Sequence, residues 1–284
     1  MPPAPLFITG GTGYLGAALV RQAAAQGEPV AATYHTQAPP PLAGVTWHAL
    51  DLRDPAAVQQ VVAQVRPRAV IHTAFRQYDP DLWAVTATGA EAVAQAAWHS
   101  NARLIHLSSD VIFDGEQPTA YTEADPPTPI SAYGAAKAAA EQMVQAAHPQ
   151  AVLVRTSLIY GFDPMDRHTR FILDVADGVQ QAALFHDELR CPVFVGDLAA
   201  ALLELVPMTW HGILNIAGGA VVSRYQFGQL LAAHYGRDPQ RIVGGYTTDH
   251  PVRRPRNCAL DLTLARSLLS TPLRGVPDVL RDRG

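Results

Sequence analysis

Lysine and cysteine are nearly missing from this sequence of 284 residues. Lys137 is the only lysine, and all the other residues with a permanently basic side chain are arginines. The two cysteines, Cys191 and Cys258, lie far apart in the sequence, so we expect two free buried thiols rather than a disulfide. No CxxC or HxxxH cluster is present, and no metal site is predicted.

Long apolar runs and clusters of basic residues are also missing. No stretch of about 18 or more apolar residues is present that would span a bilayer. The first residues lack the basic start of a secretory signal, so a cytoplasmic protein with no membrane partner is expected. The formal net charge of −4 would repel a phosphate backbone, so no nucleic-acid partner is expected.

The first half of the sequence alternates short apolar segments with longer amphipathic ones. This alternation is typical of parallel strands joined by helices that cover both faces of the sheet. Asp54 and Pro55 supply an N-cap and a first-turn proline for one of these helices. The sequence therefore predicts an α/β fold, a Rossmann-type doubly wound parallel sheet. The predicted strands cover residues 6–9, 30–34, 45–50, 69–73, 103–108 and 151–154, and the predicted helices cover residues 17–26, 55–65, 82–99 and 131–147.

The alternation becomes less regular after about residue 155, and a smaller interleaved C-terminal domain is expected there. We place the dinucleotide-binding domain at residues 1–162, with a return segment near residues 188–216. The smaller substrate-binding domain is placed at residues 163–187 and 217–284. In this half of the chain, helices are predicted at residues 170–177, 196–206 and 224–235, and strands at residues 183–186 and 213–216.

A glycine-rich segment directly follows the first predicted strand. Residues 10–16 read Gly-Gly-Thr-Gly-Tyr-Leu-Gly, and a helix is predicted to follow. Glycines permit a tight turn and a close approach of a pyrophosphate, and a helix N-terminus supplies N–H groups and a positive dipole. The segment therefore predicts a dinucleotide site. The predicted cofactor-binding residues are Gly10, Thr12, Gly13, Tyr14, Leu15, Gly16, His35, Asp51, Leu52, Thr73, Ala74, Tyr133 and Lys137.

The segment after the second strand bears on which nicotinamide cofactor binds. A site selective for NAD usually has an acidic residue there, on the ribose 2′-hydroxyl. Here residues 33–36 read Thr-Tyr-His-Thr, which permits NADP(H) but offers no arginine for its phosphate. NADP(H) is the preferred expectation, and NAD(H) stays open. Asp51 also has two interpretations, as an acceptor for the adenine amino group or as a turn residue before a helix.

Tyr133 and Lys137 are spaced i, i+4 at the start of a predicted helix, so their side chains share one face. A phenol with a free pKa near 10 is a poor proton donor at neutral pH, and a nearby ammonium lowers that pKa. The pair therefore predicts proton transfer that accompanies hydride transfer to or from a carbonyl carbon. Ser109 follows the fifth strand, where a hydroxyl either bonds the substrate oxygen or caps a turn.

These segments together resemble the extended short-chain dehydrogenase/reductase superfamily over nearly the whole chain. The segments that carry the resemblance are residues 9–16, 51–52, 108–110, 133–137 and 155–161. By this resemblance, Ser109, Tyr133 and Lys137 form a catalytic triad.

Within that superfamily the sequence is most similar to the dTDP-4-dehydrorhamnose reductase group. The similarity lies in residues 111–115, 121–125, 187–192, 196–199 and 254–255. Such enzymes reduce the 4-keto group of a nucleotide-linked deoxysugar with NADPH or NADH, so the resemblance implies a sugar nucleotide as the small-molecule substrate. The implied substrate-binding residues are Ser109, Asp110, Val111, Leu158 and Arg254.

Three positions depart from the pattern of that group. Val111 and Leu158 stand where the group usually has tyrosine and tryptophan, which suggests a different or smaller substrate. Thr86 stands where relatives often carry an asparagine that supports a proton relay or a backbone bond.

Three other polar residues are open to ordinary interpretations. Arg76 and Arg254 are either ligands of a substrate phosphate or solvated surface arginines. His72 lies inside an apolar strand and is expected to be a hydrogen-bonded histidine of the core.

Two other functions stay open alongside the reductase. One is an epimerase or dehydratase of sugar nucleotides that retains its NAD and regenerates it in each turnover. The other is a non-catalytic regulatory subunit similar to that of methionine adenosyltransferase, although the intact set Ser109, Tyr133 and Lys137 argues against it. A monomer or a homodimer is expected.

Overall fold

The structure, a computed structural model, describes residues 3–282. Its residues divide into two compact units. The first unit contains the residues up to Ser109, Ala132–Arg155 and Ala199–Leu214. The second contains Asp110–Ser131, Thr156–Leu198 and the residues from Asn215 onward. Residues 110–131 thus group with the second unit, whereas the sequence-based boundary at residue 162 counts them with the first.

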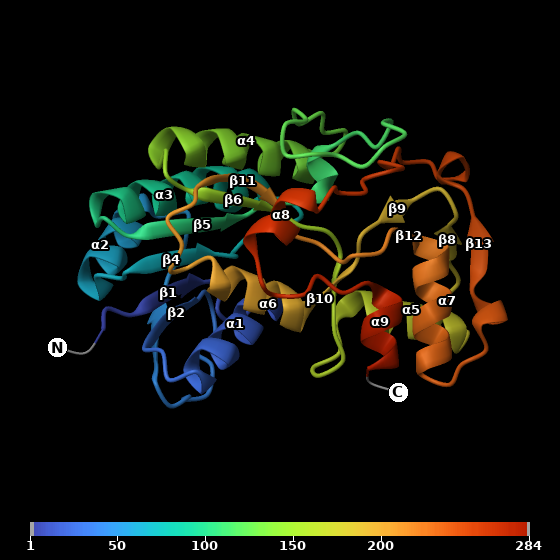
Figure 1. Ribbon diagram of the computed structural model, residues 1–284, viewed down its shortest axis with the longest axis horizontal. Coiled ribbons are helices and arrows are strands. Elements are labelled where there is room, and N and C mark those ends of the chain that lie inside the picture. The colour runs from blue at the N-terminus through green and yellow to red at the C-terminus, as the bar shows by residue number, and fades with distance from the viewer. Residues whose placement is uncertain (1–2, 283–284) are drawn as a thin grey trace. The chain divides into compact units, whose positions relative to one another are not determined.

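A seven-stranded sheet forms the centre of the first unit (Figure 1). Its strand order is β11-β6-β5-β4-β1-β2-β3. The pairs β1–β2, β1–β4, β2–β3, β4–β5 and β5–β6 are parallel. The order reverses at β1, as in doubly wound sheets, so the predicted Rossmann-type fold is confirmed. The strands are β1 Leu6–Thr9, β2 Val30–Tyr34, β3 Val45–Ala49, β4 Ala69–His72, β5 Arg103–Leu107, β6 Val152–Arg155 and β11 Gly212–Asn215.

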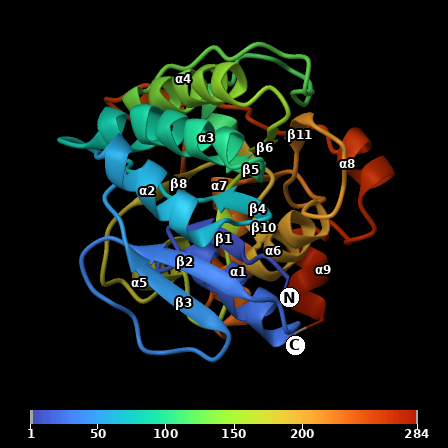
Figure 2. The same ribbon diagram turned by 90° about the vertical axis from the view of Figure 1, so that its left-hand side faces the viewer.

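Helices cover both faces of this sheet. Figure 2 shows α2, α3 and α4 along one face and α1 on the other. The start of α2 is as predicted, because the Asp54 side chain accepts a hydrogen bond from the Ala57 amide and Pro55 occupies the first turn. The helix predicted at residues 82–99 differs, because it begins with a π-helical turn, η1 Ala84–Thr88. The α-helices are α1 Tyr14–Ala25, α2 Pro55–Val65, α3 Gly89–His99 and α4 Ala132–Ala147.

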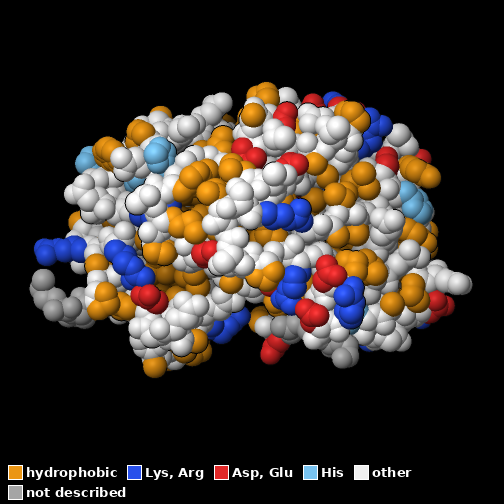
Figure 3. Space-filling view, in the orientation of Figure 1, with side chains coloured by type: hydrophobic (Ala, Val, Ile, Leu, Met, Phe, Trp, Pro, Cys, Tyr) orange, Lys and Arg blue, Asp and Glu red, His pale blue; other side chains and the backbone are white. Residues whose placement is uncertain are grey.

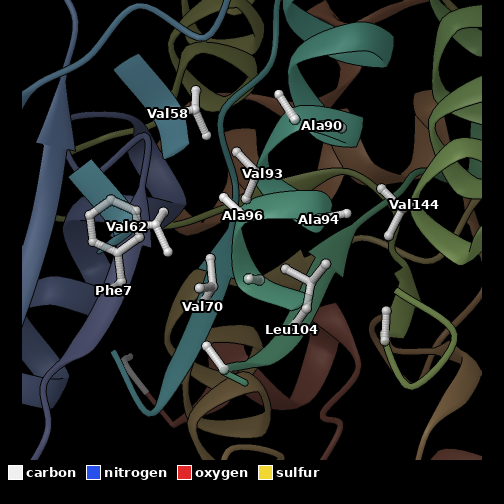
Figure 4. Packing of buried hydrophobic residues seen from close by; sticks show 14 of the residues in the cluster. Phe7, Val58, Val62, Val70, Ala90, Val93, Ala94, Ala96, Leu104 and Val144 are labelled. Carbon is white, nitrogen blue, oxygen red and sulfur yellow. The ribbon is translucent and has the colours of Figure 1, made fainter. Parts of the chain in front are cut away.

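Apolar side chains fill the space between the sheet and the helices α2, α3 and α4 (Figure 4). Five of the buried residues of α3 are alanines, and such small side chains let neighbouring helices approach closely. Strand residues of the same cluster supply the larger side chains. The residues labelled in Figure 4 are Phe7, Val58, Val62, Val70, Ala90, Val93, Ala94, Ala96, Leu104 and Val144.

A buried ion pair joins α4 to β6. The Arg155 guanidinium donates from Nε to Glu141 Oε1 at 3.1 Å and from Nη2 to Oε2 at 2.9 Å. Arg155 is only 1% exposed and Glu141 only 4%. Because α4 also carries Tyr133 and Lys137, this pair helps to fix both predicted catalytic side chains relative to the sheet.

The second unit consists of short strand pairs and helices around a core of its own. The pairs β7–β10 and β8–β13 are parallel, and β9–β12 is antiparallel. Its core includes Tyr160, Ile172, Phe227, Leu231 and Val279. The strands are β7 Ile159–Tyr160, β8 Ala183–Phe185, β9 Leu189–Arg190, β10 Val193–Phe194, β12 Val222–Ser223 and β13 Val243–Gly245. The helices are α5 Arg167–Ala176, α7 Arg224–His234, α8 Thr263–Leu268 and α9 Val276–Arg281, and the short 3-10 turns are η2 Asp110–Ile112, η3 Pro239–Arg241 and η4 Thr247–Asp249. The helix α6 Val195–Glu204 begins in this unit and ends in the first.

The structure also bears on membrane spans, metal sites, surface charge and the two cysteines. Across residues 3–282, no helix combines the length and the apolar character that a membrane span needs. In the same residues, no group of three or more His, Cys, Asp or Glu side chains is placed to hold a metal ion. Acidic and basic side chains are interspersed on the face that Figure 3 shows. Cys191 and Cys258 are buried free thiols, as predicted.

We expect the loss of one partner of the ion pair between α4 and β6 to destabilise the fold strongly. Arg155→Met leaves the Glu141 carboxylate buried without its partner, which costs about 3–5 kcal/mol of the free energy of unfolding. The double variant with Glu141→Leu removes both charges and should regain most of that loss. Urea unfolding followed by circular dichroism measures both values. Equal stability of Arg155→Met and the unsubstituted protein would contradict a buried pair.

Candidate active site

The glycine segment forms a tight turn between β1 and α1. Gly10 has a φ of +69°, a backbone conformation that favours glycine. A Cβ added at Gly16 would lie 2.0 Å from the Gly10 carbonyl oxygen, so no side chain fits there unless the backbone moves. Among the described residues, no side chain caps the start of α1, and its first turn has no acid. The dipole of α1 is therefore available to an anion.

A cleft of about 330 Å³ lies beside this turn, at the carboxyl ends of β1, β2, β3 and β4. It occupies the position where the strand order reverses, which is the usual ligand site of this fold. The residues lining it that the sequence assigned to the cofactor are Gly10, Thr12, Gly13, His35, Asp51, Leu52, Thr73 and Ala74. The others assigned near the turn, Tyr14, Leu15 and Gly16, form the first turn of α1. Further lining residues are Thr33, Tyr34, Thr36, Leu50, Arg53, Phe75, Arg76, Asp81 and Val85.

Arg53 is a charged residue of this cleft that sequence reasoning missed. Its Nε lies 3.0 Å from both carboxylate oxygens of Asp51, and its Nη2 donates to Asp51 Oδ2 at 2.6 Å. Its Nη1 donates to Asp81 at 3.1 Å. The hydrogen bonds from Arg53 hold the pKa of Asp51 well below its usual range. Asp51 is therefore an ionised side chain held by Arg53, with His35 Nε2 at 3.6 Å from it.

Lys137 is buried on α4, one turn after Tyr133, and only 3% of it is exposed. Its Nζ donates to the carbonyl oxygen of Leu107, the last residue of β5, at 2.7 Å. Burial lowers the pKa of Lys137 to about 8, while the charge of Glu141 acts in the opposite direction. An ammonium with such a pKa exchanges its proton within the range where most enzymes work.

Phe75 connects the cleft with the predicted catalytic pair. Its ring lines the cleft, and its centroid lies 5.6 Å from that of the Tyr133 ring and 5.3 Å from Lys137 Nζ. Ser109 follows the end of β5 and, like Tyr133, is half-buried. The amide of Ser108 donates to the Val154 carbonyl at 2.7 Å and anchors this end of β5 to β6. The three residues predicted as catalytic thus belong to one unit, on α4 and just after β5.

Thr86 lies in the π-helical turn η1, where the sequence predicted an unbroken α-helix. Its Oγ1 donates to the Arg76 carbonyl at 2.7 Å and accepts from the Arg76 amide at 2.9 Å. These two bonds close the loop between β4 and α3, whose first residues line the cleft. Thr86 therefore makes backbone bonds, one of the two roles expected for the asparagine that relatives carry.

The second unit holds the other residues assigned to the substrate. Asp110 is buried and accepts a hydrogen bond from Ser157 Oγ at 2.6 Å, with Arg190 Nε 3.7 Å away. The Ser157 hydroxyl in turn accepts from the Cys191 amide at 3.2 Å. Val111 and Leu158 are half-buried.

Arg254 belongs to a charged cluster that the sequence did not indicate. Its Nη1 lies 3.4 Å from Glu188 Oε2, and Arg190 Nη2 lies 3.4 Å from Oε1 of the same carboxylate. The Arg254 guanidinium lies 5.6 Å from the centroid of the Phe185 ring. Its side chain is 44% exposed, so an anion in solution can reach it.

Comparison with known proteins gives relatives along nearly the full chain. A family model described as the RmlD substrate binding domain matches residues 4–281. A dTDP-4-dehydrorhamnose reductase of Mycobacterium tuberculosis is 32% identical, over 95% of this chain and 88% of that protein. A probable dTDP-4,6-dihydroxy-2-methyloxan-3-one 4-ketoreductase of Streptomyces antibioticus is 31% identical, over 97% of this chain and 93% of its own length.

Solved structures show the same fold. The dTDP-4-dehydrorhamnose reductase of Bacillus anthracis in complex with NADP has a TM-score of 0.84 at 22% identity, over 99% of this chain and 98% of that one. The Bordetella bronchiseptica enzyme WbmG in complex with NAD and UDP has a TM-score of 0.83 at 19% identity, over 99% and 96%. The relatives confirm the predicted resemblance to the dTDP-4-dehydrorhamnose reductase group. Because the family model spans nearly every residue, the chain belongs to the RmlD substrate-binding domain family.

Proposed function

We propose that this protein is an NADPH-dependent reductase of a keto group on a nucleotide-linked sugar, of the dTDP-4-dehydrorhamnose reductase type within the extended short-chain dehydrogenase/reductase superfamily. The observation that carries the proposal is the burial of the only lysine one helical turn from Tyr133, with both side chains close to Phe75, a residue that lines the cleft. The names of the two relatives above support a keto sugar nucleotide as the class of substrate.

The residues around the cleft suit a dinucleotide. A Cβ at Gly10 would lie 2.9 Å from the Ala74 backbone nitrogen, so only glycine lets the turn pass this close to the end of β4. Gly10, Thr12 and Gly13 of this turn line the cleft, and the uncapped start of α1 suits a pyrophosphate. The ends of β2 and β3 would hold the adenosine, and Lys137 the nicotinamide ribose. Among the described residues that line the cleft, the two carboxylates, Asp51 and Asp81, both bind Arg53. No bare carboxylate therefore opposes a 2′-phosphate, which favours NADPH, with NADH as the alternative.

Tyr133 is the proposed proton donor. A bound reduced nicotinamide supplies the hydride that reaches the carbonyl carbon. As negative charge develops on the carbonyl oxygen, the Tyr133 hydroxyl donates its proton to that oxygen, and the Ser109 hydroxyl donates a hydrogen bond to it. The Lys137 ammonium stabilises the tyrosinate that remains, which lowers the free energy of the proton transfer.

Residues of the second unit are proposed to bind the sugar nucleotide. Val111 and Leu158 would contact the sugar with aliphatic side chains, which suits a substrate other than that of reductases with aromatic residues there. Arg254, half-exposed beside Glu188, would bind the diphosphate through charge-assisted hydrogen bonds. Asp110 would not contact the substrate itself but would position Ser157 and Arg190, because its carboxylate accepts a hydrogen bond from Ser157 and lies 3.7 Å from Arg190 Nε.

Reduction of a nucleotide-linked 4-ketosugar tests this proposal directly. NADPH oxidation is followed by absorbance with a dTDP-linked 4-keto-6-deoxysugar, and the product is identified by mass spectrometry. We expect one NADPH oxidised for each hydroxyl formed. The proposal fails if the protein binds NADPH but oxidises none with a panel of nucleotide-linked ketosugars. Cofactor that co-purifies in its oxidised form and does not exchange would instead favour the epimerase or dehydratase.

Tyr133→Phe should lower kcat on the order of 10²–10⁴-fold, because the ring keeps its shape but loses the donated proton. NADPH affinity, measured by fluorescence titration, should stay close to that of the unsubstituted protein. Tyr78→Phe is the matched control, because Tyr78 is 73% exposed and should tolerate loss of its hydroxyl. Full turnover by Tyr133→Phe would remove Tyr133 from the mechanism.

Reductase activity should fall as the pH rises past about 8, because Lys137 loses its proton there. Because burial lowers the pKa of Lys137, the charged form that stabilises tyrosinate predominates below about pH 8 and is lost above it. Lys137→Arg stays charged and should move this decline to higher pH, at a much lower rate, because its guanidinium fits the site poorly. The profile of kcat/KM against pH measures this. An alkaline limb that survives unchanged in Lys137→Arg would assign it to another group.

A further inference from the structure

Three polar side chains interrupt the apolar face of the sheet that α2, α3 and α4 cover. Thr9, His72 and His106 lie in register on β1, β4 and β5. Residues two positions earlier, such as Val70 and Leu104, belong to the apolar cluster on the same face. Thr9, His72 and His106 are each 1% exposed or less. An unbroken apolar layer would be the cheaper solution, so this row calls for a reason beyond packing.

The two imidazoles form a stacked pair whose nitrogens are only partly satisfied. Their ring centroids lie 5.2 Å apart, with an angle of 23° between the planes. His72 Nδ1 and Thr9 Oγ1 share a hydrogen bond of 2.6 Å, so His72 is a hydrogen-bonded core histidine, as the sequence predicted. His72 Nε2 and both nitrogens of His106 have no hydrogen-bond partner in the part of the chain that the structure describes.

The pair lies beside Lys137. The carbonyl that accepts the hydrogen bond from Lys137 Nζ belongs to Leu107, the residue next to His106. Burial, and after it the charge of Lys137, lowers the pKa of His72 to about 3, and the same causes lower that of His106 well below its usual value. Both rings are therefore uncharged at neutral pH.

Few other groups act on the Lys137 ammonium. From α4 itself this is Glu141, whose carboxylate is bound by Arg155 of β6. The Leu107 carbonyl accepts a hydrogen bond from Nζ, and the centroid of the Phe75 ring lies 5.3 Å from it. The turn η1, which packs against α4, has the sequence Ala-Val-Thr-Ala-Thr and carries no titratable side chain. α3 contributes only Glu91 and His99, and the apolar side of α4 faces its buried alanines. The sheet beneath contributes His72 and His106.

We propose that His72 and His106 are positioning residues that help to keep the buried Lys137 ammonium protonated at neutral pH, because they place polar but uncharged rings on the sheet next to it. A carboxylate in their place would bind the ammonium as an ion pair and hold its proton too firmly. An apolar side chain would leave only the Leu107 carbonyl and the Phe75 ring to stabilise the charge on this side, and so favour its loss. The inference rests on the proposed function only in that Lys137 must be charged to stabilise the tyrosinate of Tyr133.

The single lysine of this chain makes the test unusually direct. Protein labelled with ¹³C at lysine Cε gives one lysine resonance, which needs no assignment, and its chemical shift against pH reports the pKa of Lys137 without substrate or turnover. We expect His106→Phe to lower that pKa on the order of one unit, because a polar ring gives way to an apolar ring of similar size. His72→Phe should lower it in the same direction. The alkaline limb of kcat/KM should move by the same amount.

His148→Phe is the matched control. His148 is also buried in the first unit, but its Nε2 bonds the carbonyl of Ala102, before the start of β5, at the end opposite to Leu107. This variant should lose stability and leave the lysine titration in place. His106→Gln, which keeps polar atoms in the ring's position, should restore much of the pKa and serves in place of His106→Phe if that variant does not fold.

An unchanged or raised pKa of Lys137 in both His106→Phe and His72→Phe overturns the inference, whatever their activity. If neither phenylalanine variant folds, a His106→Gln protein whose lysine titrates apart from the unsubstituted one overturns it as well. The proposed function fails separately, through the absence of NADPH oxidation in a protein whose lysine titrates as expected.

Discussion

The hydrogen bond from the Lys137 ammonium to the Leu107 carbonyl is the interaction on which the rest of the site depends. This bond holds the ammonium at the end of β5. Burial there lowers the pKa of Lys137 to about 8. Phenol chemistry at neutral pH needs such a neighbour, because an isolated tyrosine holds its proton up to about pH 10. The ion pair of Glu141 with Arg155 fixes α4, and Phe75, which lines the cleft, lies 5.3 Å from the ammonium.

Local patterns in the sequence were sufficient to predict the features that repeat or are short. Alternation of apolar and amphipathic segments gave the parallel sheet, because buried parallel strands need apolar residues on both faces. The glycine segment gave the turn, since the steric demands at Gly10 and Gly16 leave no alternative residue. The spacing of Tyr133 and Lys137 gave their shared helix face, because residues i and i+4 of any helix are neighbours.

Features that depend on contacts distant in sequence were not predictable from those patterns. The bond of Arg53 to Asp81 spans 28 residues, and that of Arg254 to Glu188 spans 66. The stacking of the two buried imidazoles depends on the register of β4 against β5, which no periodicity reports. The π-helical turn η1 was not predictable either, because its residues suit an α-helix. Only the structure shows the hydrogen bonds of Thr86 to the backbone of Arg76, ten residues earlier. The strands of two or three residues in the second unit are too short to show alternation.

The ionisation of Tyr133 in the presence of the oxidised cofactor is the most direct measure of what the buried ammonium does. The near-ultraviolet absorbance of tyrosinate is titrated in the unsubstituted protein and in Tyr133→Phe, and the difference isolates one phenol. That phenol should ionise well below the ordinary value of about 10, and in Lys137→Met it should return toward it. A difference titration that shows no ionisation below the ordinary value, or the same one with and without the lysine, would contradict the central role given to Lys137.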